Sequence, residues 1–115
     1  MAVEEWFATR TSTGEQWSRR RLAELKGETT VSVVVPAQNE APTVGAIIAA
    51  LRRELVEEVP LVDELVVVDS ESCDDTAVVA HQAGARVVRQ EAVLSHLGNQ
   101  PGKGEALWKS LLVTD

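Results

Sequence analysis

Residues 30–40 read TVSVVVPAQNE, and this stretch decides the fold. Its first six residues, 30–35, are almost all apolar and mostly β-branched, and Pro36 follows them directly. β-branched residues favour strands, and a strand without polar alternation is typical of a parallel sheet that is covered on both faces. The pattern therefore predicts a buried strand over residues 30–35 that stops at Pro36, with a polar loop behind it.

Helix and strand patterns alternate along the chain after this strand. They predict further elements at residues 42–59, 65–68, 74–84, 86–89 and, after a loop, 104–113. Alternation of this kind implies right-handed crossovers and a parallel sheet, so the predicted fold class is α/β. Trp108 is expected to anchor the last helix in the core.

The residues in front of the first strand form a separate unit in this prediction. Residues 1–14 have the composition of an arm, and residues 15–26 are expected to form a short helix that Gly27 ends. The predicted domain organisation is therefore an N-terminal arm and helix at residues 1–27, followed by a sheet domain at residues 28–115.

Three polar segments lie at or near the carboxyl ends of the predicted strands, where parallel sheets bind ligands: residues 36–40, 69–75 and 101–105. Spacing alone favours an ordinary strand-to-helix turn for the first segment. In the third, a lysine, Lys103, stands between two glycines at the start of a helix. Such glycines let the backbone approach a ligand closely, and a helix N-terminus favours phosphate. The segment is not a P-loop, because the required spacing is absent.

The middle segment contains the candidates for nucleoside contact. Asp69 directly follows a buried strand, and a carboxylate there can accept hydrogen bonds from the imide of uracil or from the paired N–H groups of guanine. Ser70 is the second candidate. Asp74 and Asp75 are better explained as caps of the next helix, so no metal site is predicted here.

Composition and charge exclude several functional classes. The chain has 115 residues and a net charge of -7, which argues against a partner that is nucleic acid or an anionic membrane. Its apolar runs are far shorter than the roughly 20 residues that span a bilayer, and the N-terminus has no secretory pattern. A single cysteine cannot form an internal disulfide, so a cytoplasmic location is expected.

Four stretches together resemble one enzyme family. Residues 31–40, VSVVVPAQNE, are similar to the opening strand of GT-A glycosyltransferases, whose Rossmann-like sheet binds nucleotide sugars. Three later stretches, VDELVVVDSESCDDT (62–76), GARVV (84–88) and PGKGEALW (101–108), resemble the glucosyl-3-phosphoglycerate synthases and the related mannosyl-3-phosphoglycerate synthases. The resemblance runs from about Thr30 to the end of the chain.

The resemblance implies a reaction and a set of partners. A retaining transferase of this family moves glucose from UDP-glucose to the 2-hydroxyl of 3-phosphoglycerate, and the mannosyl enzymes use GDP-mannose instead. It also implies dependence on Mg²⁺ or Mn²⁺, and a homodimer. The family's Asp-x-Asp metal motif and its acceptor-binding half are expected beyond Asp115, so no catalytic residue and no metal ligand is expected within residues 1–115.

Carried over by motif, seven residues are expected to bind the nucleotide sugar. Those expected to line the nucleoside are Pro36, Ala37, Gln38 and Glu40, and those expected to hold the base and ribose are Asp69 and Ser70. Lys103 is expected to meet the diphosphate. Two positions depart from the family pattern: Gln38 stands where relatives commonly have Leu or Tyr, and Glu71 replaces a glycine.

Two other functions are weighed against this prediction. A dinucleotide-binding oxidoreductase needs a glycine-rich loop after the first strand, whereas the first glycine here is Gly45. A non-catalytic module that kept the sheet without the chemistry is the second alternative. The sequence that follows the last predicted helix discriminates between that module and the transferase.

Overall fold

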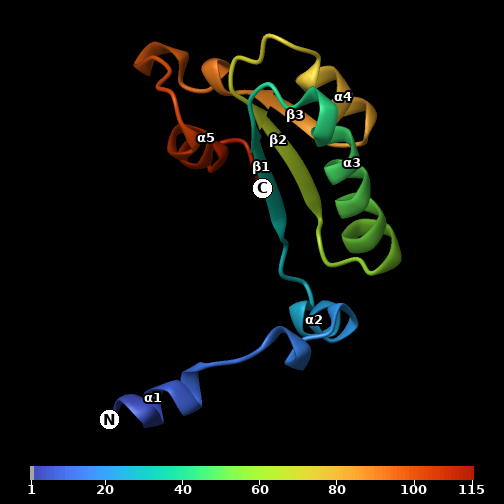
Figure 1. The fold of residues 1–115 in the computed structure, drawn as a ribbon, viewed down its shortest axis with the longest axis vertical. Helices are drawn as coiled ribbons and strands as arrows, with labels where there is room; N and C mark the ends of the chain where they lie inside the picture. The colour runs from blue at the N-terminus through green and yellow to red at the C-terminus, as the bar shows by residue number, and fades with distance from the viewer. Residues whose placement is uncertain (1) are drawn as a thin grey trace.

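The protein is described by a computed structural model that covers residues 2–115, and its centre is a three-stranded sheet (Figure 1). The strands are β1 (Ser32–Ala37), β2 (Glu64–Asp69) and β3 (Arg86–Arg89). They lie in the order β1-β2-β3, and both pairs are parallel. The parallel α/β architecture predicted from the sequence is therefore confirmed.

Helices cover both faces of the sheet. The helices that follow the three strands are α3 (Ala41–Arg52), α4 (Thr76–Gln82) and α5 (Lys103–Ser110). Val67 of β2 packs in the cluster under α3 and α4, whereas Val66 and Val68 pack against Ala106 of α5 on the other face. Figure 1 shows α5 on the opposite side of the sheet from α3 and α4. Because alternate residues of a strand point to opposite faces, a strand buried on both sides has to be apolar throughout.

The sequence predicted that the first strand stops at Pro36, and this prediction is wrong. It continues through Pro36 to Ala37, and Pro36 pairs in register with Val68 of β2. Within residues 2–115, β1 has a neighbour on one side only. An edge strand tolerates a proline because only one ladder of hydrogen bonds has to be maintained.

A cluster of polar groups joins the opposite, amino ends of the three strands. Glu64 at the start of β2 accepts hydrogen bonds from Arg86 of β3, at 2.7 Å, and from the Ser32 hydroxyl of β1, at 2.8 Å. The Arg86 guanidinium, followed by the Ser32 hydroxyl, holds the pKa of the Glu64 carboxyl below its ordinary value. Arg86 also donates to the carbonyl oxygen of Val113, so the end of the chain is tied to the same corner.

The N-terminal arm and helix differ in detail from the prediction. The predicted arm contains a helix, α1 (Val3–Arg10), and the predicted helix over 15–26 is divided into a 3₁₀ turn (Gly14–Gln16) and α2 (Arg19–Lys26). The division occurs because the hydroxyl of Ser18 accepts a hydrogen bond from the backbone N–H of Arg21, at 3.1 Å, and so starts a new helix.

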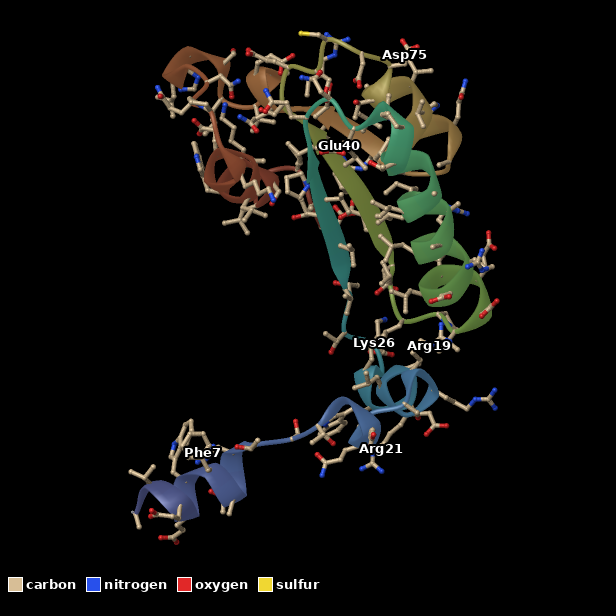
Figure 2. All side chains as sticks on the ribbon, in the orientation of Figure 1. Phe7, Arg19, Arg21, Lys26, Glu40 and Asp75 are labelled. Atoms are coloured by element: carbon tan, nitrogen blue, oxygen red, sulfur yellow. The ribbon has the colours of Figure 1, made fainter. Side chains whose placement is uncertain are left out.

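Within residues 2–115, the ion pairs between the N-terminal helices and the sheet domain come from α2, whose Arg19 lies 3.4 Å from Glu54. Lys26 at the end of α2 lies 2.8 Å from Asp63, directly before β2. Figure 2 shows Phe7 of α1 far from the sheet and Glu40 at the opposite end of the molecule. The arm therefore lies away from the carboxyl ends of the strands. No helix among residues 2–115 has the length and apolar character needed to cross a membrane.

The remaining differences concern the ends of helices. The predicted helix over 42–59 ends as α3 at Arg52 and continues as a π-helical segment (Arg53–Glu58). The last helix begins one residue earlier than predicted and ends at Ser110, and the loop before it contains two 3₁₀ turns (Gln90–Ala92 and Ser95–Leu97).

The expectation that Trp108 anchors the last helix in the core is wrong. The buried residues of α5 are Ala106, Lys109 and Ser110, which share one face at helical spacing. Trp108 therefore points away from the sheet, with 42% of its surface exposed, and its indole N–H donates to the Glu105 carboxylate.

Candidate functional site

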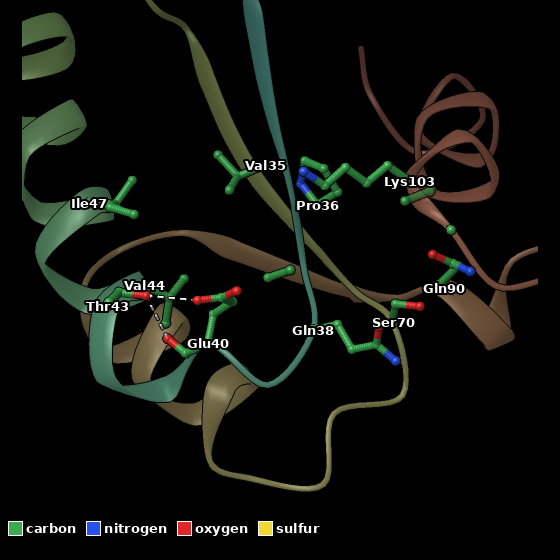
Figure 3. Close-up of a pocket in the computed structure, with 13 residues that line it drawn as sticks. Val35, Pro36, Gln38, Glu40, Thr43, Val44, Ile47, Ser70, Gln90 and Lys103 are labelled. Carbon is green, nitrogen blue, oxygen red and sulfur yellow. Dashed lines mark hydrogen bonds between the residues drawn. The ribbon is translucent and has the colours of Figure 1, made fainter.

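A cavity of about 430 Å³ lies at the carboxyl end of the sheet, where β1 meets the first turns of α3 and α5 (Figure 3). Six of the seven predicted site residues line it: Pro36, Ala37, Gln38, Glu40, Ser70 and Lys103. Residues that are up to 67 positions apart in the chain are thus brought to one cavity by the topology. Asp69, the seventh, is not among its lining residues.

Parallel pairing brings the first two polar segments to the same level. Ala37 pairs with Asp69 at the last register position, and the N–H of Ser70 donates to the Ala37 carbonyl at 2.9 Å. Because both strands end here, the loops behind them leave the sheet side by side. Ser70 consequently lies beside the end of β1, within the wall of the cavity.

Hydrogen bonds between the two loops hold them together. Three backbone N–H groups donate across the gap: Asn39 to the Ser72 hydroxyl at 2.9 Å, Cys73 to the Asn39 side-chain oxygen at 2.7 Å, and Glu40 to the Thr76 hydroxyl at 2.8 Å. Asn39 has a φ of 53°, a left-handed conformation that asparagine tolerates better than most residues. The loop that carries Gln38 and Glu40 is therefore ordered before any ligand binds.

Asp69 takes part in this network. Its side chain is largely buried, with 6% of its surface exposed, and its Oδ1 accepts a hydrogen bond from the Ser72 hydroxyl. Ser72 in turn accepts from the Asn39 N–H. Asp69 thus orients the loop that borders the cavity, and its direct contact with a base stays a prediction.

Glu71, which stands where the family pattern has a glycine, adopts a left-handed backbone conformation. Its φ is 51°, in the left-handed region that glycine adopts without strain. A residue with a Cβ pays about 1–2 kcal/mol for that conformation. The departure from the family pattern therefore adds local strain to this turn.

Asp74, and not Asp75, supplies the side chain that starts α4. Its carboxylate accepts hydrogen bonds from the Thr76 hydroxyl, from the Thr76 N–H at 3.0 Å and, across the loops, from the Ala41 N–H at 3.2 Å. The Thr76 hydroxyl, followed by these backbone groups, lowers the pKa of Asp74 below its ordinary value. Asp75 is the N-cap residue by position, but its side chain makes no capping bond.

The third segment forms the N-terminus of α5 beside the cavity. Gly102 occupies the N-cap position with a φ of 107°, which permits a tight turn into the helix, and no described side chain caps it. Lys103 is exposed, and Figure 3 shows its side chain extending from α5 toward Pro36. A helix N-terminus with a lysine favours an anionic group in this part of the cavity.

A buried lysine lies in the last turn of this helix, and no pattern in the sequence indicated its burial. Lys109 has no exposed surface, and its ammonium donates to the carbonyls of Gln90 at 3.1 Å and Gly98 at 3.2 Å and to the side-chain oxygen of Asn99 at 3.1 Å. These three acceptors lie in the loop between β3 and α5. Lys109 therefore fixes the loop that delivers Lys103 to the cavity.

The residues that the structure describes do not fit a metal ion. No group of three or more His, Cys, Asp or Glu side chains within residues 2–115 is placed to hold one. The carboxylates of residues 69 and 74 are directed into hydrogen bonds with neighbouring loops, as shown above. No metal-dependent step is assigned to these residues.

Comparison of the sequence with models of known protein families identifies the family of this chain. Residues 32–107 match the model of glycosyl transferase family 2. The chain belongs to glycosyl transferase family 2. The matched range begins with β1 and ends within α5, so it contains every element that borders the cavity.

Curated relatives within the family narrow the similarity. The chain is 44% identical over 109 residues to the glucosyl-3-phosphoglycerate synthase of Mycolicibacterium smegmatis. The matched residues are 95% of this chain and 35% of the relative. It is 41% identical over 90 residues to the enzyme of the same name from Petrotoga mobilis, and these residues are 78% of this chain and 28% of the relative. The chain thus spans about a third of the length of the curated relatives that it matches. The resemblance to this group of enzymes is confirmed.

Solved structures give the same result for the fold. The mannosyl-3-phosphoglycerate synthase of Rubrobacter xylanophilus superposes with a TM-score of 0.89 at 42% identity, over 97% of this chain and 37% of that one. The glucosyl-3-phosphoglycerate synthase of Mycobacterium tuberculosis in complex with Mn²⁺, UDP-glucose and phosphoglyceric acid superposes with a TM-score of 0.76 at 42% identity, over 92% and 36%. The predicted GT-A fold class is therefore confirmed.

Replacing Lys109 with methionine should destabilise the protein by about 2–4 kcal/mol, because the substitution removes three hydrogen bonds of a buried ammonium, one of them to the carbonyl of the buried Gln90. Urea denaturation of Lys109→Met measures the change. Lys103→Met on the exposed surface of the same helix is the matched control and should change stability by no more than about 0.5 kcal/mol. Equal stability of the two variants would contradict the role of Lys109.

The hydrogen bonds of Asp74 should make stability depend on pH in acid. Because folding lowers the pKa of Asp74, its contribution is complete above the ordinary Asp pKa of about 3.9 and is lost as the pH falls through the lowered value. Asp74→Asn should therefore reduce stability at about pH 5 and converge with the unmodified protein near about pH 2. Denaturant unfolding across this range tests it, with Asp75→Asn as the control that should show no such convergence.

Proposed function

We propose that the chain supplies the nucleotide-sugar-binding part of a retaining glucosyl-3-phosphoglycerate synthase. The reaction would transfer glucose from UDP-glucose to the 2-hydroxyl of 3-phosphoglycerate. The observation that carries the proposal is the cavity at the carboxyl ends of the strands, where six predicted residues meet the N-terminus of α5. The names of the relatives and the UDP-glucose in the M. tuberculosis structure support the choice of substrates.

The lining residues divide into two roles in this proposal. The loop at the end of β1, from Pro36 through Glu40, borders the nucleoside, and Ser70 donates or accepts a hydrogen bond at the base or ribose. The carboxylate of Glu40 is already oriented, because it accepts from the Thr43 hydroxyl at 2.9 Å. An ordered wall lowers the entropy that the protein loses when the nucleotide binds.

Lys103 would bind the diphosphate. Negative charge builds on the diphosphate as the sugar leaves, and a cation beside the N–H groups of a helix N-terminus stabilises that charge more in the transition state than in the bound substrate. Asp69 would act on the base directly or through Ser72, which it already orients. These residue roles are proposals that the substitutions below examine.

Dependence on Mg²⁺ or Mn²⁺ belongs to the proposed reaction, as in the M. tuberculosis structures that contain Mg²⁺ or Mn²⁺. The described residues present no ligand set for it. The contribution of this chain is therefore confined to binding and orienting the donor. The metal ligands and the acceptor site are assigned to other parts of the enzyme.

A mannosyl transfer from GDP-mannose is the second candidate. Its support is the TM-score of 0.89 with the mannosyl-3-phosphoglycerate synthase of R. xylanophilus.

Two further features complete the proposal: a homodimer, and a cytoplasmic location, which suits a chain whose single cysteine, Cys73, is exposed and unpaired.

Substituting Lys103 by alanine should weaken binding of UDP-glucose by about 1.5–3 kcal/mol, the range for a hydrogen bond to a charged group. Calorimetric titration of the full-length protein measures the change, and Lys103→Arg should recover part of it. Arg20→Ala removes an exposed positive charge from α2, remote from the cavity, and should leave affinity unchanged. Unaltered affinity in Lys103→Ala would rule out the diphosphate role.

A product assay tests the reaction itself. The full-length protein, incubated with 3-phosphoglycerate, a divalent metal and either UDP-glucose or GDP-mannose, should form glucosyl-3-phosphoglycerate from the first donor. A mannosyl product from the second donor alone would favour the other candidate. Tight donor binding without any product would favour the non-catalytic module.

A further inference from the structure

A buried glutamine with an unpartnered oxygen lines the same cavity. Gln90 directly follows β3, has no exposed surface and lies in the cavity wall with Ser70 and Lys103. Within residues 2–115, two buried side-chain polar atoms have no hydrogen-bond partner, Gln90 Oε1 and Glu91 Oε2, and only the first belongs to a lining residue. Buried acceptors are nearly always hydrogen-bonded, so an unpartnered one at a cavity indicates a missing donor.

The neighbouring groups fix which way the Gln90 amide faces. The Lys109 ammonium has only donors, so Asn99 must present its oxygen to it, at 3.1 Å. That oxygen and the carbonyl of Gln100 are both acceptors, and Gln90 Nε2 donates to them at 2.8 Å and 3.1 Å. The amide nitrogen is therefore held on the side of the loop, and the oxygen has to face the other way.

The side-chain oxygen of Gln90 faces into the cavity. Figure 3 shows the oxygen of Gln90 turned toward the middle of the cavity and the nitrogen turned away from it. The parallel register explains the neighbourhood: Asp69 pairs with Arg89, so the next residues of the two strands, Ser70 and Gln90, leave the sheet side by side. Gln90 thus extends the wall that begins with Ser70.

We propose that Gln90 is a specificity-determining residue that accepts a hydrogen bond from an N–H or O–H group of the nucleoside. This inference rests on the proposed binding of a nucleotide sugar in the cavity. The diphosphate offers only acceptors, so within a nucleoside diphosphate the partner has to be the base N–H or a ribose hydroxyl. A ligand without that donor leaves the buried oxygen unpartnered and is disfavoured.

The experiment uses the full-length protein and calorimetric titration with UDP, its 2′-deoxy, 3′-deoxy and N3-methyl analogues, and pyrophosphate. Gln90→Met removes the amide at nearly constant volume. Gln100→Met is the matched control, because it removes an amide from an exposed residue of the same loop whose side chain makes no hydrogen bond. Thermal denaturation shows that each variant is folded.

We expect Gln90→Met to bind UDP about 3- to 10-fold more weakly, the range for one neutral hydrogen bond, and pyrophosphate as before. One of the three analogues lacks the donor that Gln90 binds. The unmodified protein and Gln90→Met should bind that analogue with equal affinity, and this equality identifies the donor. Gln100→Met should leave the discrimination between UDP and its analogues unchanged.

Two results would overturn the assignment, and they differ from failure of the proposed function. Equal losses for UDP, all analogues and pyrophosphate would show that Gln90 only supports the loop. A loss seen with UDP-glucose but not with UDP would place its partner on the sugar. If the unmodified protein binds neither UDP nor GDP, the proposed function fails and the role of Gln90 fails with it.

Discussion

The parallel pairing of β1 with β2 is the constraint on which the site depends. Because Ala37 lies opposite Asp69 and Asp69 lies opposite Arg89, all three strands reach their carboxyl ends at one level. The residues that follow adjacent strands are therefore neighbours in space, even where they are far apart in the sequence. A shift of register by one residue would turn the buried valines of β2 toward the wrong face, so the packing of the core also fixes the geometry of the cavity.

Much of this arrangement follows from patterns that can be seen in the sequence. The run of β-branched residues at 31–35 and the shorter run at 65–68 indicate doubly covered strands, and the polar segments at their ends indicate a ligand site. The resemblance to the transferases supplied the individual residues, six of which line the cavity. Pro36 was misjudged because the rule that a proline ends a strand assumes neighbours on both sides.

The parts that the sequence did not predict involve polar groups that satisfy one another. Hydropathy places a tryptophan inward and a lysine outward on α5, yet Trp108 is exposed and Lys109 is buried. The three carbonyl-type acceptors around Lys109 reverse that preference, and they come from a loop without periodicity. Gln90 likewise acquires a role only through Asn99 and Lys109, since a glutamine in a loop has no distinguishing pattern in the sequence.

The two lysines of α5 show how one short helix can serve both structure and binding. Lys109 lies in its last turn, where a cation complements the helix dipole, and the helix also holds the loop that contains Gln90 through that side chain. Lys103 lies in the first turn, where the dipole favours an anion and no described side chain caps the helix. A group bound at the N-terminus of α5 and a donor bound at Gln90 would therefore contact two segments that the hydrogen bonds of Lys109 join. If a nucleotide binds here as proposed, its affinity would therefore depend on Lys109, which does not itself line the cavity.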